Sequence, residues 1–373
     1  MSKRGHDGQN QLGDGNKRPR RRKHLYLVLD DWNNGFSIHK IDADTIDSDS
    51  HGSTGANAVA GYLPEPALLR LASPIGSLPH ACMFFAALDT KIFAFMNQRC
   101  ALVYNTDTAV TAIGPHTPAR MRCGFGITVV SGEKLYVLSY RFLEKQHSFE
   151  VMSWAPTAPD AMMQRPTEGW SWKTLPAPPP TFTTRQRVTS YALHPDGYTI
   201  FMTTANRDTP GRRLGTYSFN TRSSEWRWHG EWALPFLDRG YFVSELDAWV
   251  GLHEDGYICS CQVASRSAPG IRKLDWQTTR EKLFYKDRDT HMRASLTYLG
   301  RSKFCLVESV VREGVEFDTD HALGDHHGCV LHVTTFGLGY NHRGELQTTN
   351  QNSTRSYLVS RHHSHFSPLV FGT

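Results

Sequence analysis

The sequence predicts an all-β protein, and three observations support that expectation. Short runs of β-branched and aromatic residues recur along the chain and are joined in pairs by Asp, Asn, Gly or Ser. No long stretch shows the 3.6-residue hydrophobic period of an amphipathic helix. The first apolar run, residues 25–29, meets an alternating run, residues 36–41, across Asn34-Gly35, which is the strongest short-range signal for a β-hairpin.

The same hairpin pattern recurs further along the chain. The paired runs are residues 126–130 with 134–138, 190–193 with 198–202, 248–252 with 257–259, and 296–299 with 304–307. A second pattern, an aromatic strand followed by a turn containing Asn and Thr, occurs at residues 103–108 and 217–223. After the second copy comes a return strand with Trp226 and Trp228, and residues 274–276 and 317–319 are weaker copies. This pattern suits the outer hairpin of a propeller blade, where a large aromatic packs between neighbouring blades.

The spacing of these units predicts a β-propeller. One apolar strand per unit begins near Leu25, Lys91, Lys134, Tyr198, Leu246 and Phe304. Kelch-type blades are about 50 residues long, so we expect residues 24–373 to form one propeller of six kelch-like blades. Seven blades can also be fitted, and two separate β-sandwiches are the alternative architecture. We interpret the Pro-rich residues 175–180 as a surface crossing between blades.

The net charge of +5, from 41 Lys and Arg against 36 Asp and Glu, comes from residues 1–23. We expect this polar, basic tail to be disordered. Two basic clusters separated by residues 5–16 fit a bipartite nuclear localisation signal that an importin would bind. The candidate residues are Lys3, Arg4, Lys17, Arg18, Arg20, Arg21, Arg22 and Lys23. A tail that only solubilises the protein, or binds RNA or anionic lipid without specificity, is the competing interpretation.

Cysteine use and hydropathy favour the nucleus or cytoplasm over secretion. The seven cysteines are odd in number and irregularly spaced, which is typical of buried reduced thiols; Cys259 and Cys261 are expected on one strand face. No apolar run approaches the roughly 18 residues that a membrane span needs, and the N-terminus lacks the apolar stretch of a signal peptide.

The sequence predicts no catalytic residue, metal or cofactor. It contains no GxSxG elbow, no phosphate-binding loop and no dinucleotide-binding glycine motif. The His and Cys residues at 325–332 and 362–365 match no known zinc spacing. Glu245 and Asp247 are expected on one face of a strand. A propeller hydrolase with an acidic central pocket, which needs two carboxylates across that pocket, is therefore the alternative function.

Four segments of the chain, residues 25–32, 170–176, 191–197 and 245–251, together look familiar. In these segments the chain resembles an uncharacterised, kelch-like plant family that is expanded in grasses and carries a domain-of-unknown-function label, and the resemblance covers nearly all of the chain from His24 onward. It implies a propeller-like fold and transfers no activity or site residue. We expect a non-catalytic scaffold that binds an unidentified protein or peptide. Binding of single-stranded nucleic acid by the basic and aromatic residues 225–229 is a weaker expectation.

Overall fold

The structure is a computed structural model, and its described part is built almost wholly of β-strands. It describes residues 24–30, 35–48, 60–71, 83–96, 100–121, 126–141, 146–154, 169–179, 186–206, 213–266, 274–315, 328–349, 352–359 and 369–372. The helical elements of this part are α1 (Ala43–Ser48) and the short 3-10 turn η3 (Ala119–Met121). The all-β prediction is confirmed, whereas the predicted disordered tail, residues 1–23, lies outside the described residues.

The strands form five hydrogen-bonded sheets, and because the eight-stranded sheet consists of two successive meanders, they make six units that we call blades 1 to 6. From the inside outward, blade 1 contains β26 (Leu369–Gly372), β1 (His24–Asp30), β2 (Phe36–Asp42) and β4 (Leu69–Leu71). Blade 2 contains β5 (Phe84–Leu88), β6 (Lys91–Phe95), β7 (Ala101–Asn105) and β8 (Val110–Gly114). Blade 3 contains β9 (Ile127–Ser131), β10 (Lys134–Arg141), β11 (Gln146–Trp154) and β12 (Trp170–Thr174).

Blades 4 to 6 follow the same meander. Blade 4 contains β13 (Gln186–Leu193), β14 (Thr199–Asn206), β15 (Arg213–Asn220) and β16 (Glu225–Gly230). Blade 5 contains β17 (Leu237–Val243), β18 (Ala248–Leu252), β19 (Ile258–Gln262) and β20 (Trp276–Thr278). Blade 6 contains β21 (His291–Gly300), β22 (Lys303–Val311), β23 (Cys329–Tyr340) and β25 (Ser353–Val359), with β3 (Gly61–Tyr62) beside β25 and β24 (Leu346–Thr348) beside β23.

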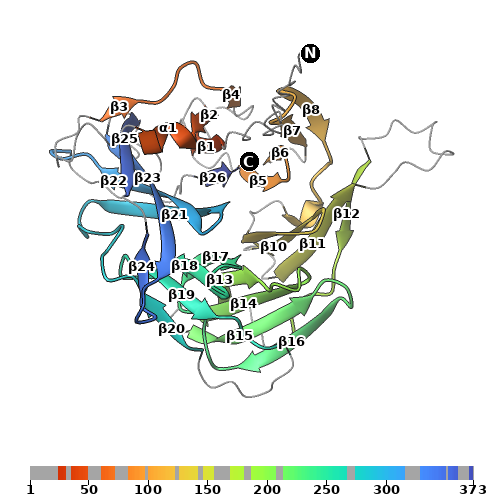
Figure 1. Cartoon of the computed structure of the whole chain (residues 1–373). Coiled ribbons are helices and arrows are strands. Elements are labelled where there is room, and N and C mark those ends of the chain that lie inside the picture. Colours follow the sequence, from red (N-terminus) through yellow and green to blue (C-terminus); the bar gives the residue numbers. More distant parts are fainter. Residues whose placement is uncertain are drawn as a thin grey trace, which may run out of the picture.

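The blades close into a ring, because a strand from the C-terminal part of the chain completes the first blade. Strand β26 pairs antiparallel with β1 and contacts β21 of blade 6. In Figure 1 the colours run around the molecule in sequence order, and the blue β26 lies beside the red β1. The ring is a β-propeller, and its six described blades agree with the predicted number.

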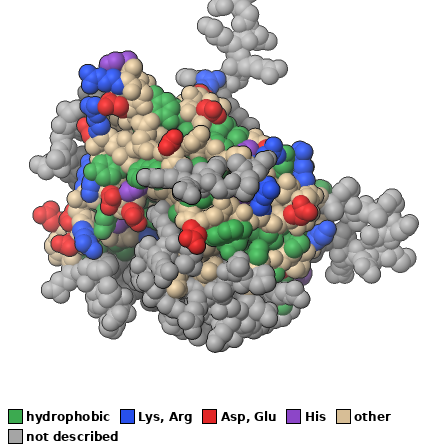
Figure 2. Space-filling model, turned by 90° about the horizontal axis from the view of Figure 1, so that it is seen from below, with side chains coloured by type: hydrophobic (Ala, Val, Ile, Leu, Met, Phe, Trp, Pro, Cys, Tyr) green, Lys and Arg blue, Asp and Glu red, His purple; other side chains and the backbone are tan. Residues whose placement is uncertain are grey.

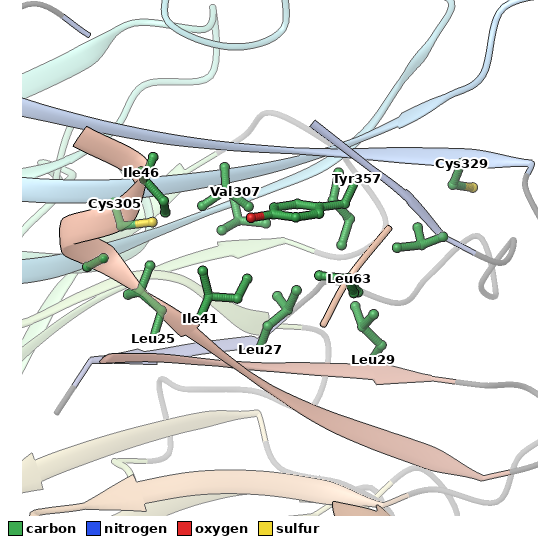
Figure 3. Packing of buried hydrophobic residues seen from close by; sticks show 14 of the residues in the cluster. Leu25, Leu27, Leu29, Ile41, Ile46, Leu63, Cys305, Val307, Cys329 and Tyr357 are labelled. Atoms are coloured by element: carbon green, nitrogen blue, oxygen red, sulfur yellow. The ribbon is translucent and has the colours of Figure 1, made fainter. Parts of the chain in front are cut away.

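Six hydrophobic clusters fill the six interfaces between neighbouring blades. Alternating side chains of a single strand face opposite neighbours, as a two-residue period requires. In β1, Leu25 and Leu27 pack with Val307 of blade 6, whereas Tyr26 and Val28 belong to the cluster shared with blade 2. Figure 3 shows the first of these interfaces, where side chains from β1 and β2 meet those from β22, β23 and β25. Each blade is therefore buried on both of its faces.

The apolar strands that the sequence analysis used as blade markers are the second strands of the six blades. Residues 25, 91, 134 and 304 lie within β1, β6, β10 and β22, and residues 198 and 246 lie one and two residues before β14 and β18. These strands are buried toward both neighbouring blades, so they lack the polar alternation of an exposed strand. This double burial explains why they were the clearest signal in the sequence.

The two predicted outer hairpins have the same turn. Asn105 Oδ1 accepts hydrogen bonds from the backbone N–H groups of Asp107 and Thr108, at 3.0 and 3.3 Å. Asn220 Oδ1 accepts from Arg222 and Ser223, at 2.9 and 3.1 Å. Both turns connect the third and fourth strands of their blades, which confirms the prediction for these two copies. Of the weaker copies, residues 274–276 lead into β20, whereas residues 317–319 lie outside the described residues.

The Pro-rich stretch is a crossing between blades, as predicted. Its described residues, 175–179, follow β12 of blade 3 and precede β13 of blade 4. Trp226 Nε1 on the outer strand β16 donates a hydrogen bond to the carbonyl oxygen of Pro176, at 3.0 Å. Trp226 itself packs on Phe149 of blade 3 and Phe219 of blade 4. The predicted packing of tryptophan between blades is confirmed here, and Trp170 and Trp249 are buried at other interfaces.

Candidate functional site

The charged residues of the innermost strands are gathered on one half of the propeller axis. Among the described innermost strands, β26, β5 and β9 contain no ionisable side chain, whereas β13, β17 and β21 contain Arg187, Asp238, Arg239, His291 and Arg293. Arg187, Asp238, Arg239 and Arg293 are called the axial cluster below. They come from three successive blades and occupy the second or third position of their strands, so they lie near the face of the propeller at which the innermost strands begin. We call this the start face and the opposite one the end face.

The axial cluster is positioned by an unusual pairing of two innermost strands. Strands β13 and β17 run parallel and are hydrogen-bonded, with Ser190 opposite Asp238 and Tyr191 opposite Arg239. The pairing of β17 with β18 is interrupted between Leu237 and Tyr241. Within this irregular stretch Asp238 has a φ of 53°, in the left-handed region that residues other than glycine rarely adopt.

The carboxyl group of Asp238 is accessible to water but surrounded by protein. Its side chain is exposed, yet desolvation is the largest influence on the carboxyl and raises its pKa, while Arg293 and Arg187 act in the opposite direction. Within the described residues no ion pair involves Arg187, Arg239 or Arg293.

Two tyrosines support the cluster. The guanidinium of Arg239 stacks on the ring of Tyr241, with its Cζ 4.7 Å from the ring centroid, and Tyr241 Oη donates to the carbonyl oxygen of Leu296, at 2.8 Å. This contact ties the first strand of blade 5 to that of blade 6. Burial raises the pKa of Tyr191, although nearby Arg239 lowers it in part. Tyr191 therefore stays neutral at neutral pH, and three guanidinium groups against one carboxyl group give the axial cluster a formal net charge of +2.

The sequence-based candidates lie elsewhere. All eight residues of the predicted nuclear localisation signal, Lys3, Arg4, Lys17, Arg18, Arg20, Arg21, Arg22 and Lys23, lie outside the described residues. The same holds for most of the histidines considered as zinc ligands; the described part of the chain contains no group of three or more side chains that could hold a metal ion. Cys259 and Cys261 are buried side by side between blades 4 and 5, as predicted.

One structural expectation about acidic residues is wrong. Glu245 and Asp247 do not lie on a strand, because β17 ends at Val243 and β18 begins at Ala248. They belong to the connecting turn, where Asp247 has a φ of 47°. Asp tolerates this left-handed conformation better than most residues, so its presence at this turn has a structural reason.

The axial cluster has no clear signal in the amino-acid sequence. Its residues lie within runs such as Gln186-Arg187-Val188-Thr189 that alternate in polarity like any half-exposed strand. A usable signal would have been the contrast between the polar first strands of blades 4 to 6 and the apolar first strands of the other blades. To see this contrast, one must know which strand of each blade is innermost, and the sequence alone does not show that.

The fold and the site define a six-bladed β-propeller with a basic cluster at its axis. The chain belongs to the family described as "Protein of unknown function (DUF1668)", whose model matches residues 22–357. The expected domain-of-unknown-function family is thereby confirmed, whereas its kelch-like character and its expansion in grasses stay predictions. None of the curated protein sequences matches the chain.

The solved structures to which the chain is similar share little sequence identity with it. Apo AztD from Citrobacter koseri shares 9% identity, with a TM-score of 0.40 over 94% of this chain and 98% of that one. Hsv2 from Kluyveromyces lactis shares 8% identity, with a TM-score of 0.38 over 88% of this chain and 98% of the other. In the described residues, no helix has the length and hydrophobicity that crossing a membrane would require.

Proposed function

We propose that this propeller is a non-catalytic scaffold that binds an acidic segment of a protein partner at the axial cluster. The observation that carries the proposal is that Arg187 of blade 4 and Arg293 of blade 6 both act on the carboxyl group of Asp238 of blade 5, with no ion pair to either arginine from the described residues. Arginine forks bind carboxylates in a bidentate manner through charge-assisted hydrogen bonds. The net charge of +2 at the axis favours a ligand that carries at least two carboxylates.

The alternative, a hydrolase with an acidic central pocket, is less well supported. That chemistry uses two carboxylates on opposite sides of a pocket. The described innermost strands place Asp238 beside three arginines, a field that favours binding of anions. Binding therefore accounts better for the charge observed at the axis.

Removing two of the axial arginines is expected to weaken binding of an acidic peptide at least about tenfold. The probe is a dye-labelled pool of random peptides with a central Glu-Glu pair, compared with a Gln-Gln pool by fluorescence anisotropy. The test variant is Arg187→Gln/Arg293→Gln. Its control is Arg288→Gln/Arg312→Gln, which removes the same charge from exposed positions beside the two ends of the β21–β22 hairpin. Equal binding of both pools by the wild type would contradict the proposal.

A substitution of Asp238 is expected to change peptide binding in the direction opposite to the arginine substitutions. Asp238→Asn removes the negative charge between Arg187 and Arg293 and is expected to tighten binding of the Glu-Glu pool several-fold. If this variant instead binds the pool more weakly, Asp238 contacts a cation of the partner and the ligand is not simply acidic.

We also propose that residues 1–23 carry the protein into the nucleus through an importin. The two basic clusters and their spacer support this proposal. A tandem fluorescent-protein fusion is expected to concentrate in the nucleus and to lose this enrichment when residues 1–23 are deleted. Replacing Lys17, Arg18 and residues 20–23 by Gln should have the same effect, whereas Asp7→Asn/Asp14→Asn should not. Unchanged localisation after the deletion would exclude the tail as the signal.

A further inference from the structure

Positive charge is not confined to the axial cluster. Figure 2, which shows the molecule from below relative to Figure 1, has Lys and Arg side chains in separate groups on the left and on the right. A second arrangement of arginines surrounds Tyr198, which directly precedes β14 in blade 4. It lies on the end face, because the turn at residues 194–197 follows the last residue of the innermost strand β13.

Two arginines contact the ring of Tyr198 from different blades. The guanidinium of Arg222, in the β15–β16 turn of blade 4, lies over the ring with its Cζ 4.0 Å from the centroid. The Cζ of Arg266, which follows β19 of blade 5, lies 5.5 Å from the same centroid, and its Nη1 donates a hydrogen bond to Tyr198 Oη. We call Tyr198, Arg222 and Arg266 the Tyr198 clamp.

Asp196 holds the clamp in place. Its carboxylate accepts hydrogen bonds from the backbone N–H groups of Tyr198 and Thr199, both at 2.9 Å, and from Thr199 Oγ1 at 2.7 Å. It also pairs with Arg266 Nη1, at 3.3 Å. Burial alone would raise the pKa of this carboxyl, but the hydrogen bonds from Tyr198 and Thr199 outweigh burial and lower the pKa. Asp196 is therefore charged at neutral pH and fixes Arg266 beside the tyrosine hydroxyl.

The charge around the clamp does not cancel. Arg227 joins the group, because its Nη1 donates to the carbonyl oxygen of Arg266, at 2.5 Å. The neighbouring His194 is neutral, since burial lowers its pKa more than Asp196 raises it. Three guanidinium groups and one carboxylate leave a net charge of +2, and Arg222, Arg227 and Arg266 are exposed.

The clamp also has unused hydrogen-bond donors. Tyr198 Oη accepts from Arg266, so its own O–H is left to donate, and no acceptor for it occurs within the described residues. The guanidinium of Arg222 stacks on the ring and forms no ion pair with a described residue. Arg222, Arg266 and the Tyr198 hydroxyl thus offer three donor groups next to one another at the ring of Tyr198.

We propose that the Tyr198 clamp binds a phosphate monoester carried by a protein partner. A phosphorylated serine or threonine has three acceptor oxygens and a charge of about −1.5 to −2 at pH 7, which matches the three donor groups and the net charge of +2. A carboxylate or a nucleic-acid phosphodiester carries one negative charge and matches less well. Recognition of phosphorylated segments by arginine clusters is an established binding mode of scaffold domains.

The experiment compares three peptide pools on the full-length protein. Dye-labelled random peptides with a central phosphoserine, glutamate or serine are titrated with the protein by fluorescence anisotropy, and a labelled oligothymidylate serves as a phosphodiester probe. The phosphoserine pool is expected to bind at least about tenfold more tightly than the serine pool and more tightly than the other two probes. Equal binding of the phosphoserine and serine pools, or tighter binding of the oligonucleotide, would overturn the proposal.

Single substitutions test whether the phosphate group binds at the Tyr198 clamp. Arg222→Gln is expected to reduce binding of the phosphoserine pool about tenfold, and Tyr198→Phe, which retains the stacked ring, several-fold. The control Arg343→Gln removes an arginine that is also exposed but lies in the turn after β23. A loss as large in Arg343→Gln would show that binding follows overall charge. The axial variant Arg187→Gln/Arg293→Gln should leave this binding within about twofold; if it abolishes the binding instead, the phosphate belongs to the axial cluster.

Discussion

Deleting residues 369–373 is expected to abolish cooperative folding of the propeller. The deletion removes β26, which pairs with β1 from Leu25 to Val28 and places Leu369, Val370 and Phe371 against the clusters on both sides of blade 1. It also removes the carbonyl oxygen of Val370, which accepts a hydrogen bond from Thr297 Oγ1 of blade 6, at 3.1 Å. Blade 1 would lose its innermost strand and its link to blade 6.

The expected decrease in the free energy of unfolding is comparable with the total stability of an ordinary domain. A net 0.5–1.5 kcal/mol for each of the lost hydrogen bonds, together with three partly buried side chains, gives about 5 kcal/mol or more. Folded domains are typically stable by about 5–15 kcal/mol. The measurement is thermal unfolding followed by circular dichroism, with a protein that lacks residues 1–23 as the control. The control should melt within about 2 °C of the full chain, because the sequence predicts a disordered tail there. If removal of residues 369–373 also shifts the melting temperature by no more than about 2 °C, β26 does not close the ring.

Replacing Trp249 by alanine is expected to destabilise the protein by about 3–5 kcal/mol, the range for large aromatic side chains removed from a core. Trp249 is fully buried between blades 4 and 5, where its ring packs on Phe201 with centroids 5.4 Å apart. Its Nε1 donates to the carbonyl oxygen of Leu193 of blade 4, at 2.9 Å. The substitution would leave both a cavity and an unpaired acceptor at this interface.

The matched control is another tryptophan, Trp228→Ala. The side chain of Trp228 is 46% exposed on the outer strand β16 and packs on Tyr217, so its removal should cost about 1 kcal/mol. Trp249→Phe separates the two contributions, since it retains an aromatic ring and removes the hydrogen bond to Leu193. Guanidinium unfolding measures all three variants, provided the m-values agree. Similar losses for Trp249→Ala and Trp228→Ala would contradict the assignment of the core at this interface.

The sequence does not show which two strands of a blade a given hairpin turn connects. The turns His194-Pro195-Asp196-Gly197 and His253-Glu254-Asp255-Gly256 look alike, and in each the histidine Nδ1 accepts from the backbone N–H of the aspartate. The first connects the first and second strands of blade 4, whereas the second connects the second and third strands of blade 5. They therefore lie on opposite faces of the propeller. A turn depends on its own few residues, and those residues carry no information about the strands that flank the hairpin.

The sequence by itself determined the all-β class, the six doubly buried strands and the turn chemistry at Asn105 and Asn220. These features depend on burial and on hydrogen bonds between residues a few positions apart, so local patterns record them. Only the tertiary structure decided how the ring closes through β26 and which polar residues meet. Arg187, Asp238 and Arg293 come from three strands, and Arg266 reaches Tyr198 across 68 residues. Such contacts follow from the packing of one blade against the next, and no local pattern in the sequence encodes which blades become neighbours.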